Sequence, residues 1–266
     1  MEQKKSHFHD YSHAVEYDRR AGRSEIRAEF VPRLVEALAL TGREWVLDLA
    51  TGTGRVARPV AERLKGGRVV GLDEALAMLR VAGEQEPVPG FLAAAGKAEA
   101  FPFRSEVFDR ALTVLALHHF GQPALTVREV LRVLRPGGRF VILDPVVAPK
   151  KDALDGTIHE LINQILSRGH GGESFHYYAI EDIGELLASA GLRLAQAELL
   201  TFAVDQEGID GIPTGRHWLE VAQQIQGESL QLRRRFEERF FRYEKREGKI
   251  RVRGNFYFAL VSGEKR

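Results

Sequence analysis

The sequence feature that most constrains the fold is the stretch 46–54, Val-Leu-Asp-Leu-Ala-Thr-Gly-Thr-Gly. An apolar run that enters a glycine turn and continues into an amphipathic segment, residues 55–64, predicts a buried strand, a tight turn and a helix. Glycine permits a left-handed backbone and leaves no Cβ between the chain and a ligand. Because the first N–H groups of a helix have no partner inside it, we expect this turn to bind a ligand.

The same pattern of apolar run and amphipathic segment recurs along the chain. Further strands are predicted at residues 68–72, 91–95, 108–115 and 139–144. Their apolar residues are continuous rather than alternating, as in strands that are covered on both faces. We therefore predict an α/β fold with a doubly wound, mostly parallel sheet, whose ligands lie beyond the carboxyl ends of the strands. Polar groups at these ends are Asp48, Gly52, Gly54, Asp73, the loop 96–99, His118 and His119.

The composition excludes several classes of function. The 266 residues include no cysteine, which removes disulfides, Cys-ligated metals and thiolate nucleophiles. A formal net charge of +1 gives no reason to expect nucleic acid as a partner. No apolar stretch is long enough for a bilayer, and the N-terminus lacks the apolar region of a signal peptide. We expect a cytoplasmic protein without stable membrane insertion; a homodimer is compatible with the sequence.

Two polar segments have both a functional and a plain interpretation. Residues 7–13 contain three histidines and an aspartate, but such an N-terminus is more typical of a solvated end than of a metal site, so we expect no metal. In the predicted helix 230–246, Phe236, Phe240 and Tyr243 share one face among many arginines. The interleaved glutamates favour a solvated helix over contact with a membrane or RNA.

The glycine turn alone does not identify the ligand. Residues 52–57 fit the G-x-G-x-x-A pattern of dinucleotide sites, and Asp73 lies about 20 residues further on, as such sites require. A nicotinamide-dependent oxidoreductase is therefore a rival interpretation. Asp48, just before the glycines, argues against it, because a carboxylate would repel a pyrophosphate but attract a cationic amino group.

Five motifs in register decide between these interpretations. They are VLDLATGTG, VVGLDEALAML, GKAEAFPF, FDRALTVLALHHF and VLRPGGRFVILDP, and together they cover about residues 45–145. In this order they resemble the motifs of class I S-adenosylmethionine-dependent methyltransferases, in particular the ubiquinone/menaquinone-biosynthesis type. The resemblance implies a seven-stranded Rossmann-like sheet with a helical cap and an insertion.

The resemblance also implies a domain organisation. Residues 1–44 would form an N-terminal helical cap, and 45–147 the cofactor-binding core. A helical insertion would span 148–191. Residues 192–266 would supply the last strands of the core, with a second helical insertion at about 208–250 and a final strand at 255–261.

The family implies roles for individual cofactor-binding residues. Asp48 would hold the methionyl amino group of S-adenosylmethionine, and Asp73 both ribose hydroxyls. The backbone at Ala50, Gly52 and Gly54 would allow close approach of the methionyl and ribose parts. The residues implied elsewhere are Met78 and Ala98 at the adenine, and Leu115 and Ala116 along the methionyl arm. Met78 has an alternative role as ordinary helix core.

One position departs from the family pattern. Members usually carry Asp, which accepts a hydrogen bond from the adenine amino group, where this chain has Lys97. Lysine has no acceptor, so either Glu99 or the backbone takes this role, or the adenine is held loosely.

The acceptor side is less defined. His119, or its neighbour His118, is the candidate general base if the acceptor must lose a proton; otherwise one histidine caps the strand end and positioning alone drives transfer. Candidates for closing the pocket are Tyr11, Tyr17, Tyr177 and Tyr178. The fourth motif lacks the Asn/Asp-Pro-Pro-aromatic sequence of enzymes that methylate exocyclic amines. A small, partly apolar acceptor remains: a quinol, a phenol, an enol carbon or an amine. A protein that binds S-adenosylmethionine without turnover is the third alternative.

Overall fold

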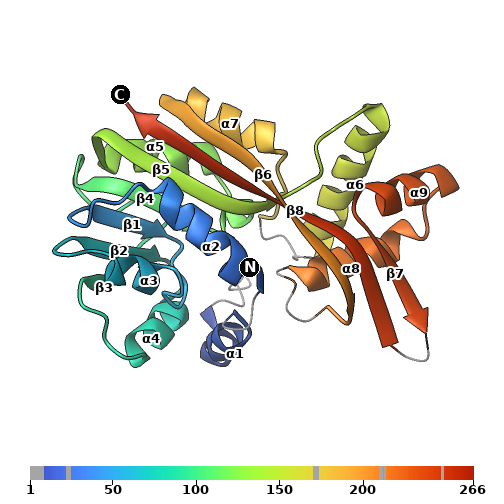
Figure 1. Ribbon diagram of the computed structural model, residues 1–266, viewed down its shortest axis with the longest axis horizontal. Helices are drawn as coiled ribbons and strands as arrows, with labels where there is room; N and C mark the ends of the chain where they lie inside the picture. Colours follow the sequence, from blue (N-terminus) through green and yellow to red (C-terminus); the bar gives the residue numbers. More distant parts are fainter. Residues whose placement is uncertain (1–8, 22–24, 170–173, 210–211, 213, 247–248) are drawn as a thin grey trace, which may run out of the picture.

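The computed structural model describes residues 9–21, 25–169, 174–209, 212, 214–246 and 249–266. Its strands form one mixed sheet in the order β3-β2-β1-β4-β5-β8-β6, with β7 paired to β8 outside this path (Figure 1). The elements of the first half of the chain are α1 (Tyr11–Ala21), α2 (Glu25–Ala37), β1 (Trp45–Leu49), α3 (Ala57–Glu62), β2 (Arg68–Asp73), α4 (Leu76–Glu84), β3 (Phe91–Ala95), β4 (Phe108–Val114), a 3-10 turn (Leu117–His119) and α5 (Pro123–Val133). Those that follow are β5 (Leu134–Val146), α6 (Ala153–Gly169), α7 (Ile180–Ser189), β6 (Leu192–Glu207), α8 (Gly215–Ile225), α9 (Leu230–Arg239), β7 (Phe241–Arg246) and β8 (Lys249–Lys265).

The predicted doubly wound sheet is confirmed. Strands β3, β2, β1, β4 and β5 run parallel, and Asp48 of β1 stands between Gly71 of β2 and Leu112 of β4. Helices α2 and α3 cover one face, where Leu34 and Val60 are fully buried. Helices α5 and α7 cover the other face. Since all five parallel strands end at one edge, the polar residues that follow them are gathered there.

Strands β8 and β6, the last two in the order of the sheet, extend far beyond this core. Strand β8 runs antiparallel to β5 over residues 257–264, and its other end pairs with β7 over residues 249–254. Strand β6 follows β8 from Leu192 to Glu207. The far halves of β6 and β8, with β7, α6, α8 and α9, form the lobe in the right half of Figure 1. The largest core cluster joins Phe258 to Trp218 of this lobe, so the lobe shares the core of the sheet.

Two expectations about the C-terminal region are wrong. The segment 230–246 is not one helix: α9 ends at Arg239, and β7 begins at Phe241. The final strand spans 249–265 rather than 255–261, so the insertion at about 208–250 is not wholly helical and the sheet gains an eighth strand. Phe236, Phe240 and Tyr243 have helical spacing, but residues 241–244 also alternate between aromatic and charged residues. Pairing with β8 supplies their backbone hydrogen bonds, and this decides for a strand.

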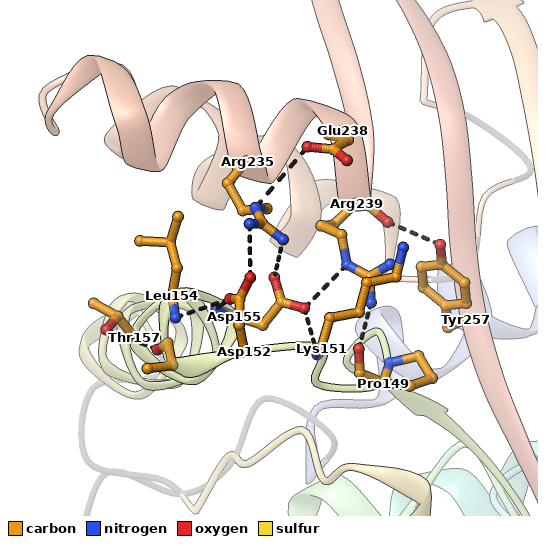
Figure 2. Close-up of polar contacts among 11 residues, drawn as sticks. Pro149, Lys151, Asp152, Leu154, Asp155, Thr157, Arg235, Glu238, Arg239 and Tyr257 are labelled. Atoms are coloured by element: carbon orange, nitrogen blue, oxygen red, sulfur yellow. Dashed lines mark hydrogen bonds and ion pairs between the residues drawn. The ribbon is translucent and has the colours of Figure 1, made fainter.

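An ionic cluster around a buried carboxylate joins α6 to α9 within the C-terminal lobe (Figure 2). Asp155, in the first turn of α6, is 2% exposed, and its carboxylate lies 3.4 Å from Nη1 of Arg235 and 3.2 Å from Nε of Arg239. The Tyr257 hydroxyl donates to the Arg239 carbonyl at 2.8 Å. The chain that leaves β5 is thus held to α9 and β8 together.

Within the described part of the chain, no helix is long and apolar enough to cross a membrane.

Candidate active site

The two glycines of the turn after β1 differ in their surroundings. Gly52 and Gly54 both have left-handed backbones, with φ of +55° and +78°. A Cβ at Gly54 would lie 3.2 Å from the Phe91 ring, so this glycine permits close packing. A Cβ at Gly52 would meet no heavy atom within 4 Å. The space beside Gly52 is therefore open, and close approach of a ligand to its backbone stays a prediction.

Asp73 connects this turn to the end of β2. Its Oδ2 accepts from the Gly52 N–H and its Oδ1 from the Ala75 N–H, both at 2.8 Å. Burial raises the pKa of the Asp73 carboxyl above its ordinary value, and the two N–H donors limit the rise. Each carboxylate oxygen keeps a lone pair for a further donor. The side chain is thus oriented and able to accept two hydroxyls.

Asp48 lies beneath the turn and is 2% exposed. Its Oδ2 accepts from the Thr51 hydroxyl at 2.7 Å. Asp48, Gly52, Tyr17 and Val114 line a cavity of about 30 Å³, close to the volume of one water molecule. The acidic side chain and the open glycine fit the amino-acid end of S-adenosylmethionine. Tyr17 is the residue of α1 that lines this cavity.

The residues that the family pattern implies at the adenine differ in exposure. Lys97 is exposed, and its backbone forms an isolated antiparallel β-bridge with Ala100. Ala98 and Glu99 are half-buried. Met78 is 3% exposed and packs in a small cluster of α4 with Ala14 of α1, in line with the helix-core alternative. Contact between Met78 and adenine stays a prediction.

The backbone is strained at the ends of two neighbouring strands. Ala50 after β1 has φ of +56°, and Leu115 after β4 has φ of +55°, although neither is glycine. Such strain costs about 1–3 kcal/mol per residue and is concentrated at functional sites. Leu115 is half-buried and the adjacent Ala116 is buried, which is compatible with their implied place along the methionyl arm.

The two histidines after β4 have different surroundings. His118 is 2% exposed, and its Nδ1 lies 2.6 Å from Oδ1 of Asp144, at the end of β5. This matches the alternative in which one histidine holds the strand end. The ring of His119 is half-buried and lies with its centroid 4.1 Å from that of His118. His119 therefore remains the better candidate for contact with an acceptor.

An aromatic cluster surrounds the two histidines. The Phe175 ring lies 5.1 Å from His118, 5.3 Å from His119 and 5.1 Å from His217 of α8, measured between centroids. Tyr177 stacks on Trp218 at 5.2 Å. The backbone of His176 donates to the His118 carbonyl at 2.9 Å, which joins the segment 174–179 to the turn after β4. We call His118, His119, Phe175, Tyr177, His217 and Trp218 the aromatic cluster.

The four candidate tyrosines separate clearly. Tyr17 lines the small cavity, and Tyr177 is 1% exposed within the aromatic cluster. Tyr178 is half-buried next to it in the chain. Tyr11 lies elsewhere: it is 37% exposed, and its hydroxyl donates to Glu84 on α4. Tyr11 is therefore the weakest of these candidates.

Several residues of the site had no assigned role in the sequence. Asp18 of α1 accepts from the Thr53 hydroxyl and pairs with Arg55. Asp144 contacts His118, and His217 contacts Phe175. Asp144 lies inside the fifth motif, which is the only sequence signal that could have found it. In the described residues, no three or more His, Asp or Glu side chains are arranged to hold a metal ion. Part of the histidine-rich segment 7–13 lies outside the described residues.

Comparisons with known proteins place the chain among methyltransferases. A family model described as a methyltransferase domain matches residues 47–142. The demethylmenaquinone methyltransferase of Thermus thermophilus is 34% identical over 177 residues, which cover 60% of this chain and 78% of that protein. The enzyme of the same name from Renibacterium salmoninarum is 31% identical over 153 residues, covering 56% of this chain and 63% of the relative.

A solved structure extends the likeness to nearly the whole fold. The YcgJ protein of Bacillus subtilis superposes with a TM-score of 0.70 at 20% identity, covering 90% of this chain and 99% of that one. The first two curated relatives are matched over only 63% and 47% of their own length. The family model also ends before α6, so the lobe that carries Phe175, His217 and Trp218 lies outside it. The sheet, the glycine turn with its two acidic partners and the relatives agree: the chain belongs to the class I S-adenosylmethionine-dependent methyltransferases of the ubiquinone/menaquinone-biosynthesis type.

Proposed function

We propose that the protein transfers a methyl group from S-adenosylmethionine to a small, partly apolar acceptor with a planar phenolic or hydroquinone ring. Enol carbons and amines are less favoured acceptors, and neither nucleic acid nor a protein side chain is one. The observation that carries the proposal is the aromatic cluster that follows the cofactor side of β4. Val114 lines the cavity beside Asp48, and four residues later His118 and His119 stand against Phe175.

Four members of the cluster are buried against one another, and only His119 and His217 are half-buried. These two imidazole rings are the members that can contact an acceptor, and ring faces attract other planar rings by offset or edge-to-face packing. The names of the relatives from Thermus thermophilus and Renibacterium salmoninarum support a quinone-like acceptor.

Different residues of the chain have different roles in methyl transfer. When bound, S-adenosylmethionine supplies a methyl group on a positively charged sulfur, which makes that carbon electrophilic. Asp48 attracts the amino group of the methionyl part, and Asp73 accepts the ribose hydroxyls. The rings around His119 orient the acceptor and exclude water. Because the reaction joins two held groups, positioning supplies a large part of the rate enhancement.

A base is needed only for an acceptor that must lose a proton. A phenol has an ordinary pKa near 10, so removal of its proton near neutral pH benefits from a nearby base. His119 is the residue for this role, because His118 is already held by Asp144. The proposal assigns His118 to positioning and His119 to proton acceptance.

The test combines binding with turnover. Calorimetry should detect S-adenosylhomocysteine and no NAD or NADP, whereas clear NAD binding without S-adenosylhomocysteine binding would refute the proposal in favour of an oxidoreductase. Transfer of labelled methyl groups should then be measured with hydroquinones, phenols, enols and amines of similar size. Methylation of hydroquinones or phenols is expected. Binding of S-adenosylhomocysteine without transfer to any of these would indicate a binding protein without turnover.

The role of His119 can be tested separately. His119→Ala should lower kcat most for acceptors with the highest phenolic pKa and leave the affinity for S-adenosylhomocysteine unchanged. His176→Ala is a suitable control, because His176 lies close in space but is exposed. A normal rate in the His119 variant with every acceptor would remove the residue from the mechanism.

A further inference from the structure

The carboxylate of Asp144 receives hydrogen bonds from three consecutive residues. Its Oδ2 accepts from the backbone N–H groups of Ala116 and Leu117, both at 2.8 Å, and its Oδ1 lies 2.6 Å from Nδ1 of His118. Asp144 is 1% exposed, so these contacts are made away from bulk water. Hydrogen bonds to a charged, buried acceptor are stronger than neutral ones. One side chain of β5 therefore defines the whole turn after β4.

This turn needs such support because its first residue is strained. Leu115 has a left-handed backbone without being glycine, which costs on the order of 1 kcal/mol or more. A strained residue persists only where its neighbours fix it. The Leu115 N–H donates to the Leu143 carbonyl at 2.8 Å, and the next two N–H groups are held by Asp144. Both contacts come from adjacent residues of β5.

The same carboxylate fixes the ring of His118. An ionised carboxylate can only accept hydrogen bonds, so Nδ1 of His118 must carry a proton when the two atoms are 2.6 Å apart. The ring of His118 in turn contacts other members of the aromatic cluster. The centroid of this ring lies 4.1 Å from that of His119 and 5.1 Å from that of Phe175. The backbone carbonyl of His118 accepts from the His176 N–H. The half-buried ring of His119 is thus placed relative to Asp144.

We infer that Asp144 is a positioning residue for methyl transfer, which sets the strained backbone at Leu115 on the cofactor side and the His118–His119 rings on the acceptor side. The inference rests on the proposed function for its catalytic consequence. Asp144 touches neither reactant. It acts through the turn after β4, and a small displacement of this turn changes the alignment on which transfer depends.

The main test is Asp144→Asn, which keeps the shape of the side chain. An amide has one acceptor oxygen and a donor NH₂ group, so it cannot serve three donors. We expect kcat to fall by about tenfold or more, equivalent to about 1.4 kcal/mol of lost alignment. The affinity for S-adenosylhomocysteine should change only a few-fold, because Asp48 and Asp73 are untouched. Nitrogen NMR should show that His118 no longer holds its proton on Nδ1.

Glu44→Gln provides a matched control. Glu44 is also a buried carboxylate that holds a turn, accepting from the N–H groups of Thr41 and Gly42 at 2.6 and 2.8 Å, but it precedes β1 at the opposite edge of the sheet. The Glu44→Gln variant should have a lower melting temperature, as should Asp144→Asn. Its kcat and the nitrogen NMR signals of His118 should be unchanged. If both variants lose only stability, Asp144 is a structural residue and the inference is wrong.

Two further measurements test the role of Asp144. If Asp144→Asn does not fold, His118→Asn tests the same link, since it removes the ring and leaves the backbone donors of Ala116 and Leu117 to Asp144. An unchanged kcat in that variant would overturn the inference. If the wild-type protein transfers no methyl group at all, the proposed function fails. Asp144 is then judged on the nitrogen signals of His118, and wild-type-like signals in Asp144→Asn would overturn the inference.

Discussion

The carboxylate of Asp18 lies 2.6 Å from Nη2 of Arg55, and this ion pair joins the first helix to the glycine turn. The other oxygen of Asp18 accepts from the Thr53 hydroxyl at 2.6 Å. Although burial acts to raise the pKa of Asp18, the hydrogen bonds from Arg55 and Thr53 outweigh it and hold the pKa below its ordinary value. Helix α1 is thereby fixed over the cavity beside Asp48.

Loss of this pair should loosen α1. Asp18→Ala is expected to speed the release of S-adenosylhomocysteine several-fold, measured by stopped-flow fluorescence. Its cost in stability should stay near 1 kcal/mol, since the pair is partly exposed. Glu16→Gln is the matched control, because it breaks the exposed pair with Arg19 on the same helix. Equal release rates in both variants would show that α1 does not control access.

Asp73 should give cofactor binding a characteristic pH dependence. Its carboxylate can accept both ribose hydroxyls only when ionised, so affinity is present above its pKa and lost as the pH falls through it. Because burial raises this pKa, the loss should begin at a higher pH than for an ordinary aspartate. Calorimetric titrations with S-adenosylhomocysteine across mildly acidic pH would detect it.

The matching substitution is Asp73→Ala. It should weaken S-adenosylhomocysteine binding by about tenfold or more, since each hydrogen bond to a charged group contributes about 1.5–3 kcal/mol. The exposed neighbour Glu74, changed to Ala, should bind as the wild type does. Unchanged affinity in Asp73→Ala would disprove the assigned role.

Lys97 should make adenine recognition weak and alterable. Lys97→Asp supplies the acceptor that lysine lacks, so the variant should bind S-adenosylhomocysteine several-fold more tightly. The variant should bind S-inosylhomocysteine no better than the wild type does, because hypoxanthine carries an oxygen where adenine has its amino group. Lys65→Asp, another exposed lysine, controls for the change in net charge. A parallel gain for both ligands would indicate a charge effect only.

His159 should reduce the stability of the protein in acid. It is 6% exposed, and burial together with the nearby Lys150 lowers its pKa to about 4. The unfolded chain takes up the proton at about pH 6.5, so between these values it binds more protons and stability falls as the pH falls. The loss should reach about 3 kcal/mol.

Urea unfolding at several pH values measures this effect. His159→Gln should unfold with a flatter pH dependence of the free energy than the wild type. The pKa of His176 is also lowered by burial, but its side chain is more exposed, so the same replacement there should remove a smaller part of the dependence. If His159→Gln keeps the full slope, another group is responsible.

The cluster around Asp155 should be strongly coupled. Arg239→Met leaves the buried carboxylate without one of its two guanidinium partners and should cost about 3 kcal/mol of the free energy of unfolding. Adding Asp155→Asn should recover part of this loss, which a double-mutant cycle measures. The exposed pair of Arg242 and Glu237, disrupted by Arg242→Met, should cost less than about 1 kcal/mol. Additive losses in the cycle would contradict the coupling.

The sequence by itself determined the parallel core and the edge at which the site lies. Apolar runs that alternate with amphipathic segments are local patterns, and the right order of such units leaves few sheet topologies. The turn at Gly52 and its two acidic neighbours were likewise readable, because the glycine and the strand ends lie within short stretches of chain. The motifs added the family, and with it the cofactor.

Only the tertiary structure decided the rest, because it depends on partners far apart in the chain. Whether residues 241–246 form a helix or a strand was settled by pairing with β8, although their spacing allowed both. The different surroundings of His118 and His119 depend on Asp144, which contacts His118 and lies 26 residues beyond it on the adjacent strand. Phe175 and His217 reach the same cluster from separate segments. Local spacing fixes which face a residue occupies, whereas long-range packing fixes which residue it meets.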